Sequence, residues 1–308
     1  MLAYFIRRVI HGLLVIFLIS VATFGILQLA PGSPIDVMLG DTQLTQDQLD
    51  AVERKWGLDR PWYQQYFTWA GNMLRGDFGV SIVRTGQPVS DMLRDAAPVT
   101  LKLNGIAFGI ALTIALPMGV LAAIRRNSLF DYSSMLGATL CVALPSFWIS
   151  LMLIIIFALK LGWLPSSGSG TWTHYVMPVA VLAVEQTALL ARVSRGATLE
   201  DLKQDYVTTA RAKGLSERLV IARHVVRNAM LPIVTIVGLR IAFLLSGTII
   251  IETIFAWPGI GRLFMDSVFR LDYQVVQAIV LLLSVLVVVT NLLTDLLYAL
   301  IDPRIRIR

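Results

Sequence analysis

The side chains that could do chemistry in this chain are few and widely spaced. Its three histidines are His11, His174 and His224, and its one cysteine, Cys141, lies inside an apolar run. Zinc sites and activated nucleophiles need two or more such groups brought close together. The sequence therefore predicts no disulfide, no metal site and no histidine-based catalytic centre in this chain.

Motifs for bond chemistry are also missing. The chain has no G-x-x-x-x-G-K-[ST] phosphate loop, no H-E-x-x-H, no G-x-S-x-G and no G-x-G-x-x-G. Asp77–Gly79 spells D-F-G, a tripeptide of kinases, but no other kinase motif accompanies it. We expect a protein that is not an enzyme and that binds no cofactor itself.

Charged residues inside apolar segments are more informative. Glu185, Arg240 and Glu252 lie in or near long apolar stretches, where an ionisable side chain is costly and marks a pathway or a paired partner. Two interpretations of Glu185 and Arg240 stay open: they line a translocation path, or they form a structural pair between helices. Lys102 and Asp295 lie near the ends of such stretches, and we expect them to reach the membrane surface or to cap a helix.

The elements that position these residues are membrane helices. The 308 residues are 56% hydrophobic and 15% charged, against about 25% charged in soluble domains, and the mean hydropathy is +0.72. A helix needs about 20 apolar residues to cross a bilayer. Six stretches reach or approach this length: Val9–Ala30, Val99–Ile124, Ser133–Leu159, Tyr175–Ala191, Ala229–Ile251 and Val275–Leu300. The sequence thus predicts an all-α membrane protein with six transmembrane helices.

The distribution of basic residues orients these helices. The first stretch is too long for a signal peptide and lacks a clear cleavage site, so we expect it to remain as a membrane helix. With the N-terminus inside, the inner segments hold 15 of the 26 basic residues, whereas the outer segment 31–97 holds six basic and nine acidic residues. The positive-inside rule places both termini in the cytoplasm. The net charge of +6 then reflects inner loops, not the binding of nucleic acid.

Three parts follow from this pattern. Residues 1–30 comprise the cytoplasmic N-terminus and the first transmembrane helix, 31–97 an extracytoplasmic helical cap, and 98–308 a core domain with five transmembrane helices and a cytoplasmic loop, 192–228. In the cap, Leu49, Val52 and Trp56 have helical spacing, and Gly57 is a suitable end. Pro61 opens a second helix that carries Tyr63, Tyr66, Phe67 and Trp69. We expect most of Trp56, Trp62, Tyr63 and Trp69 to form the core of this cap.

A basic segment, Thr209–Pro232, lies between two of the apolar stretches. Gly214 divides it into a short helix and a longer helix that enters the membrane at Pro232. In the longer helix, Leu215, Leu219, Ala222 and Val226 are expected on one narrow face. Such a segment can dock into a groove of a cytoplasmic partner or lie on anionic lipid, and its composition is consistent with both.

The stretch from Tyr206 to Pro232 resembles the EAA loop of ABC importer permeases, whose form is E-A-A, three residues, Gly, and a later hydrophobic residue with Pro. Thr208, Thr209 and Ala210 stand at the E-A-A positions, Gly214 at the Gly, and Leu231 with Pro232 at the closing pair. The Glu is absent, and T-A-R-A-K-G is the variant of the peptide, nickel and glutathione branch. Segments along nearly the whole chain resemble the first permease subunit of dipeptide importers, namely the opening MLAYFIRRVIHGLLVIFLISVATFGILQLAPGSP and then GLDRPWYQQY, GDFGVSI, LGWLPSSG, ETIFAWPGIGRL and DPRIR.

This resemblance implies a type I ABC importer permease in a bacterial inner membrane. The implied partners are membrane lipid, a homologous second permease, two ATP-binding subunits that hold ATP and Mg²⁺, and an extracytoplasmic solute-binding protein. The chain would form a translocation path that works by alternating access. Coupling to the ATPases would fall to Thr208, Thr209, Ala210, Arg211, Ala212, Lys213, Gly214 and Leu215.

The substrate implied is a di- or oligopeptide. A nickel chelate or glutathione is the alternative within the same family. An ion-coupled secondary carrier is the alternative from another class, and it would use its intramembrane charges for coupling and would need no ATPase.

Overall fold

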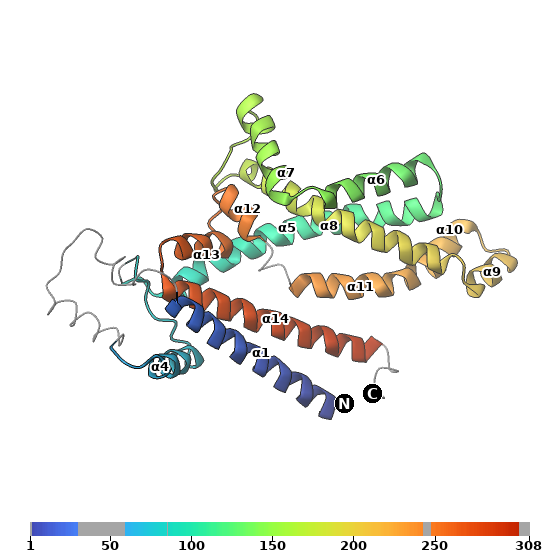
Figure 1. Ribbon diagram of the computed structural model, residues 1–308. Coiled ribbons are helices and arrows are strands. Elements are labelled where there is room, and N and C mark those ends of the chain that lie inside the picture. The colour runs from blue at the N-terminus through green and yellow to red at the C-terminus, as the bar shows by residue number, and fades with distance from the viewer. Residues whose placement is uncertain (1, 30–58, 85, 243–247, 302–308) are drawn as a thin grey trace. The chain divides into compact units, whose positions relative to one another are not determined.

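The computed structural model describes residues 2–29, 59–84, 86–242 and 248–301, and in these ranges the chain is built from helices without named strands (Figure 1). The elements are α1 (Leu2–Leu29), α4 (Trp62–Leu74), α5 (Val89–Ile124), α6 (Leu129–Ala143), α7 (Ser146–Leu153), the π-helix η1 (Ile154–Lys160), α8 (Trp172–Asp201), α9 (Asp205–Ala212), α10 (Glu217–Leu219), the π-helix η2 (Val220–Val225), α11 (Val226–Ala242), α12 (Ile249–Ile254), α13 (Ile260–Phe269) and α14 (Tyr273–Ile301).

Four helices in the described part are long and apolar enough to cross a membrane, and the number rises to six if each of two bent helix pairs is one span. The four are α1, α5, α8 and α14. The predicted all-α fold is confirmed. Two of its spans have a different form from the one expected, and others have different limits.

The third predicted span, Ser133–Leu159, is not one straight helix. It consists of α6 followed by α7 and η1, and the two arms meet at an angle of 99°. Pro145 stands before the first residue of α7, and Leu144 is extended, with ψ of 129°. Proline lacks an amide hydrogen and pushes the preceding residue out of the helical region, so the break follows from Pro145.

Three other predicted limits are also corrected. α5 begins ten residues before Val99, and α8 is 30 residues long although the sequence suggested the shortest span there. Hydropathy marks only the part of a helix that lies in lipid, whereas backbone hydrogen bonding continues into polar turns. In the fifth predicted span, Ala229–Ile251, α11 is described as far as Ala242 and a separate helix, α12, starts at Ile249 after Thr248, whereas residues 243–247 lie outside the described part.

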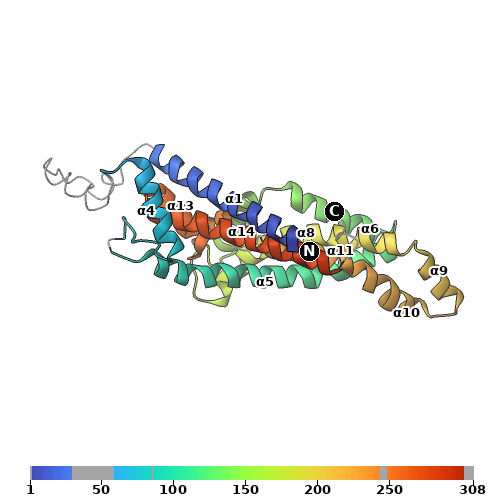
Figure 2. The ribbon, with the colours of Figure 1, turned by 90° about the horizontal axis from the view of Figure 1, so that it is seen from below.

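The chain forms two compact units, one of residues 1–99 with 258–308 and one of residues 100–257. In the first unit α1 lies along α14, as both ribbon views show (Figures 1 and 2). The two helices come so close that a Cβ added at Gly12 would lie 2.5 Å from Val288 Cγ1. A residue without a side chain is what permits this approach.

Helix α4, in the same unit, packs on α1 through aromatic side chains. Tyr66 and Trp69 are buried against Phe24, with ring centroids 5.5 and 5.8 Å from that of Phe24. The helix predicted after Pro61 is present as α4, and Trp69 is buried as expected, but against α1. The prediction is wrong for Trp62 and Tyr63, which are exposed because only one face of α4 meets α1.

The first predicted helix of the cap, with Leu49, Val52, Trp56 and Gly57, lies outside the described residues.

In the second unit, α8 is the central helix. It packs against α6, α7 and α11, and Leu190 and Ala191 are fully buried in a cluster with Phe108, Ala111 and Ala115 of α5. A Cβ added at Gly119 would lie 2.6 Å from both the carbonyl oxygen of Ala191 and the Cβ of Ser194. Small residues on α5 and α8 thus let the two helix backbones approach, as is common in membrane bundles.

Candidate coupling loop and polar sites

The loop that resembles the EAA motif is a short helix closed by a glycine. α9 starts at Asp205, separated from the end of α8 by three residues, and runs to Ala212. The amide of Gly214 donates to the Arg211 carbonyl at 2.9 Å, and the amide of Leu215 donates to the Ala210 carbonyl at 3.4 Å. This pair of bonds is a Schellman motif, and Gly214 supplies the left-handed residue that it needs, with φ of 78°. The predicted division of the segment at Gly214 is confirmed.

The inner face of α9 packs on the helix that follows. Val207, Ala210, Val220 and Val225 form a buried cluster, with Leu202 and Leu215 packed against it. The predicted apolar face of Leu215, Leu219, Ala222 and Val226 is therefore wrong. Residues 220–225 form a π-helix. Its i to i+5 winding brings Val220 and Val225, five positions apart, to the same side.

The outer face of α9 is exposed and basic. Thr208, Thr209, Arg211, Ala212 and Lys213 all lie on the surface, whereas Ala210 faces the buried cluster. The guanidinium of Arg211 donates to both carboxylate oxygens of Glu217, at 2.6 and 3.0 Å. This hydrogen bonding holds the pKa of Glu217 below its ordinary value and raises the pKa of Arg211. The pair spans the Gly214 turn and favours one loop conformation.

Tyr206, in the first turn of α9, connects this helix to the membrane helices. Its hydroxyl donates to Asp201 Oδ1 at 2.8 Å, and Asn228 lies near it. Asp201 ends α8 and Asn228 lies in the first turn of α11. Burial, the largest contribution, raises the pKa of Tyr206. The sequence analysis did not single out Tyr206, because the partners of a tyrosine hydroxyl leave no local pattern.

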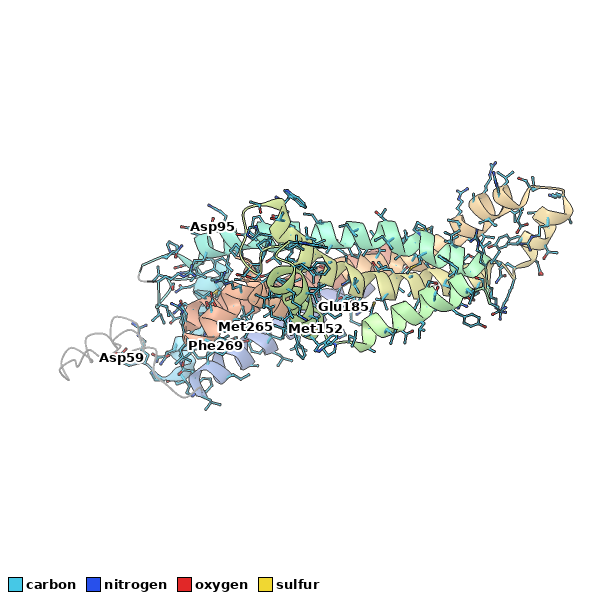
Figure 3. All side chains as sticks on the ribbon, turned by 90° about the horizontal axis from the view of Figure 1, so that it is seen from above. Asp59, Asp95, Met152, Glu185, Met265 and Phe269 are labelled. Atoms are coloured by element: carbon cyan, nitrogen blue, oxygen red, sulfur yellow. The ribbon has the colours of Figure 1, made fainter. Side chains whose placement is uncertain are left out.

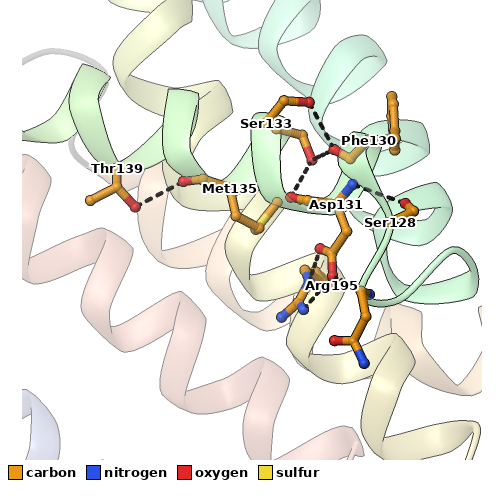
Figure 4. A network of polar contacts seen from close by, with 9 residues as sticks. Ser128, Phe130, Asp131, Ser133, Met135, Thr139 and Arg195 are labelled. Atoms are coloured by element: carbon orange, nitrogen blue, oxygen red, sulfur yellow. Dashed lines mark hydrogen bonds and ion pairs between the residues drawn. The ribbon is translucent and has the colours of Figure 1, made fainter.

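A second polar site joins α6 to α8 (Figure 4). Arg195 donates to both carboxylate oxygens of Asp131, at 2.6 and 2.8 Å, and Asp131 also accepts from the amide of Asn127 at 3.0 Å. The Asp131 side chain is 3% exposed and that of Arg195 is 27% exposed. Ser128 caps the start of α6 by accepting from the amide of Asp131. The spacing S-x-x-D is a helix-start signal that could have marked Asp131, but nothing in the sequence indicated its pairing with Arg195.

Glu252 is the most deeply placed of the predicted intramembrane charges, with 0% exposure. Its Oε1 accepts from the hydroxyls of Thr100 at 2.7 Å and Thr248 at 2.9 Å. Asn104 donates to the backbone carbonyl of Thr100, so the buried carboxylate lies within a polar network of α5 and the start of α12. Sequence analysis missed both threonines and Asn104, because short polar residues are common in membrane helices and have no diagnostic spacing.

Glu185 and Arg240 are placed differently. Glu185 is exposed on α8 (Figure 3), and Arg240 is half-buried on α11. Among the described residues neither side chain makes an ion pair, so the structural pair considered from the sequence is not formed here. Lys102 lies over the ring of Tyr175, 5.3 Å from its centroid. The side chain of Asp295 lies outside the described residues.

Residues that could hold a metal ion do not gather in the described part, where no group of three or more His, Cys, Asp or Glu side chains is found.

Comparison with known proteins identifies the family. Residues 115–307 match the family described as binding-protein-dependent transport system inner membrane component, and residues 1–104 match the N-terminal region of such membrane components. The chain belongs to this family. It is a permease subunit of a binding-protein-dependent ABC importer, as its EAA-like loop predicted.

Two curated relatives match the permease from end to end. The oligopeptide transport system permease protein AppB of Bacillus subtilis is 42% identical over 315 residues, which cover 99% of each chain. The glutathione transport system permease protein GsiC of Escherichia coli is 39% identical over 306 residues, again covering 99% of each chain.

Two solved structures share the fold. An amino acid ABC transporter crystallised with histidines matches 70% of the permease and 94% of its own chain, with a TM-score of 0.51 and 17% identity. An inward-facing form of the methionine ABC transporter MetNI matches 68% and 96%, with a TM-score of 0.53 and 17% identity. The predicted type I importer fold is confirmed, and the permease is a multi-pass protein of the inner membrane.

Proposed function

We propose that this permease forms the path for di- or oligopeptides in an ATP-driven importer. The observation that carries the proposal is the match to a relative named as an oligopeptide permease, which is 42% identical over 99% of both chains. Permeases of one fold differ in substrate, so the fold alone does not indicate a peptide. We infer the peptide substrate from sequence similarity over the full length of the chain.

Glutathione is the second candidate substrate, favoured by the relative named as a glutathione permease at 39% identity. Glutathione is itself a short peptide with free carboxylates, so the same path chemistry suits both. A nickel chelate remains an alternative within the family, and no residue of the described part is arranged as a metal site.

The exposed face of α9 is the proposed contact with the ATPase. Thr208, Thr209, Arg211, Ala212 and Lys213 are available to a partner, whereas Gly214 and Leu215 shape the turn behind them. A short helix in a groove of a partner is a common recognition mode. Two ATPase subunits would bind ATP and Mg²⁺, and this chain would hydrolyse nothing.

The contacts of α9 suggest how its motion enters the membrane. Tyr206 is hydrogen bonded to Asp201 at the end of α8 and lies near Asn228 of α11, and the Val207 side of α9 is buried against η2. When the ATPases close on ATP, α9 would carry α8 and α11 as packed bodies, which is rigid-body alternating access. We place the N-terminus and this loop in the cytoplasm.

The proposal also includes the remaining subunits and the residues of the path. A second homologous permease would complete the path, and the cap at 31–97 would receive the solute-binding protein. Glu185 and Arg240 are ionisable groups on α8 and α11, Glu252 lies on the short helix α12, and ionisable groups inside a membrane mark paths. Glu252 is fully buried and accepts a hydrogen bond from Thr100 of α5. We therefore propose that it holds α5 and α12 together beside the path.

The test is purification of the complex from native membranes, followed by an ATPase assay in proteoliposomes. We expect a second permease and two ATPases to co-purify, and solute-binding protein loaded with dialanine to stimulate hydrolysis. If only glutathione stimulated hydrolysis, the proposed substrate would be wrong, whereas the proposed subunit composition would stand. Isolation of the chain without ATPases, under conditions that preserve other importers, would overturn the proposed function.

A further inference from the structure

A pocket in the first unit is unrelated to the coupling loop and to the intramembrane charges. Its volume is about 320 Å³, and it is formed by the turn before α5, the first two turns of α5 and the start of α13. We call it the hairpin pocket. Its charged lining is Arg84, Asp95, Arg262 and Asp266, and all of its lining residues belong to the same compact unit.

The turn that forms one wall is fixed to the end of α13. Val80 and Pro88 form an antiparallel bridge, and the amide of Val89 donates to the Gly79 carbonyl at 3.0 Å. Asp272, 2% exposed, accepts from the Ser81 hydroxyl and from the Ile82 amide. Because Asp272 follows α13 closely, this buried carboxylate holds the two walls of the hairpin pocket at a set separation.

The lining of the hairpin pocket combines apolar and charged side chains. Met92 is 4% exposed and Leu263 is 8% exposed, whereas Asp95 lies on the surface near the start of α5 (Figure 3). The lining holds two guanidinium groups and two carboxylates. The Nε of Arg262 lies 3.7 Å from Oδ2 of Asp266. Small-molecule sites usually combine apolar contacts with a few placed polar groups.

We propose that the hairpin pocket is an entry site that holds the charged termini of a short peptide. Arg84 and Arg262 would receive the terminal carboxylate, for which guanidinium geometry is well matched. Asp95 and Asp266 would receive the terminal ammonium group, and Met92 and Leu263 would contact a side chain of the peptide. This inference rests on the proposed function and adds where and by which groups the peptide is held.

The position and size of the hairpin pocket favour a peptide over a loop of the solute-binding protein. The turn from Gly79 to Pro88 belongs to the predicted outer segment, so the pocket would open where substrate arrives. Its volume is that of a small-ligand site. Weak binding is sufficient, since peptide released from a docked binding protein would meet the pocket before it diffuses away.

The experiment measures peptide binding to the purified complex in lipid nanodiscs without the solute-binding protein. Dialanine and its C-terminal amide are titrated against the wild type, Arg84→Gln and Asp95→Asn by ligand-observed NMR. Arg94→Gln is the matched control, because Arg94 is exposed on α5 beside Asp95 but does not line the pocket. Docking of peptide-loaded binding protein to each complex is measured in parallel, together with the ATPase activity that it stimulates.

We expect the wild type and Arg94→Gln to bind dialanine and to bind the amide less well. Arg84→Gln should bind dialanine about tenfold more weakly and lose the preference for the free carboxylate. Asp95→Asn should weaken the binding of both ligands, because both carry the ammonium group.

Two results would overturn the inference. One is unchanged peptide binding in both variants with weakened docking of the binding protein, which would make the pocket a docking surface. The other is a wild type that binds no dialanine at about 10 mM, above any useful local concentration. Failure of the proposed function is distinguishable, since it would appear as a wild-type complex whose ATPase does not respond to peptide-loaded binding protein.

Discussion

Gly214 illustrates how one residue decides the shape of the loop that resembles the EAA motif. A Cβ at this position would meet nothing within 4 Å, so space is not the constraint. The constraint is its φ of 78°, which closes α9 and sends the chain back along η2. This left-handed conformation costs a residue with a side chain about 1–2 kcal/mol of conformational free energy. The cost is higher for β-branched residues than for asparagine.

We therefore expect Gly214→Val to lower peptide-stimulated ATPase activity and transport severalfold, while Gly214→Asn retains most of both. Both variants should insert in the membrane and assemble, since the loop is outside the apolar spans. Transport and hydrolysis in proteoliposomes measure the effect. Equal activity of the valine and asparagine variants would show that the left-handed turn is not required for coupling.

Arg195 is a second residue whose effect can be predicted. It neutralises Asp131, whose side chain is 3% exposed, and its removal would leave a carboxylate buried without its partner. Loss of one member of a buried ion pair lowers the free energy of unfolding by about 3–5 kcal/mol. Because Arg195 is partly exposed, we expect a smaller decrease of about 1–3 kcal/mol.

Thermal unfolding of the purified complex tests this expectation. Arg195→Met should lower the melting temperature, and adding Asp131→Asn should restore part of the loss, because no charge then remains buried. Arg192→Met is the control, as Arg192 is exposed on the same helix. If the double variant were no more stable than Arg195→Met, the unpaired charge of Asp131 would not be the cause of the lower melting temperature.

At the scale of elements, the packing of α5 on α8 depends on Gly119. The Cβ of any other residue would lie 2.6 Å from the Ala191 carbonyl oxygen, so the helices would have to separate. Overpacking of this kind costs about 1–3 kcal/mol. The same helix offers a matched comparison, because a Cβ at Gly109 would meet nothing within 4 Å.

We expect Gly119→Ala to lower the melting temperature of the complex and Gly109→Ala to leave it unchanged or slightly raise it, since alanine is the better helix former. The measurement is thermal unfolding in the same detergent for both variants. A Gly119→Ala protein as stable as the Gly109→Ala protein would mean that α5 and α8 are not in contact in the assembled importer.

At the scale of the whole molecule, much apolar surface remains exposed. Only 11% of the apolar window of α1 is buried within the chain, and Ile10, Leu13 and Phe17 are among its exposed side chains. In a subunit of a membrane complex, this surface faces lipid or neighbouring subunits. The same surface in a soluble protein would cause aggregation.

Membrane orientation is a prediction at this scale. In a Cys141→Ala background, Arg75→Cys should react with a membrane-impermeant maleimide in right-side-out vesicles, whereas Lys213→Cys should react only after permeabilisation. Both positions are exposed. The reason is the excess of basic residues in the segments assigned to the cytoplasm. The reverse labelling pattern would invert the topology and place α9 away from any cytoplasmic ATPase.

The sequence alone was sufficient for the class, the approximate spans and the turn at Gly214. These features depend on residues that are close together in the sequence. A bilayer requires runs of apolar residues, and a left-handed turn requires a residue such as Gly214. Pro145 also carried a local signal for the break between α6 and α7, although the hydropathy of Ser133–Leu159 concealed it.

Only the tertiary structure decided which polar residues meet. Asp131 and Arg195 are 64 positions apart, and Thr100 and Glu252 are 152 positions apart. Hydrophobic periodicity describes which face of a helix is buried but not which helix covers it. The pairings therefore follow from the packing of α5, α6, α8 and α12, where a buried charge is stable only beside the partner that the fold brings to it.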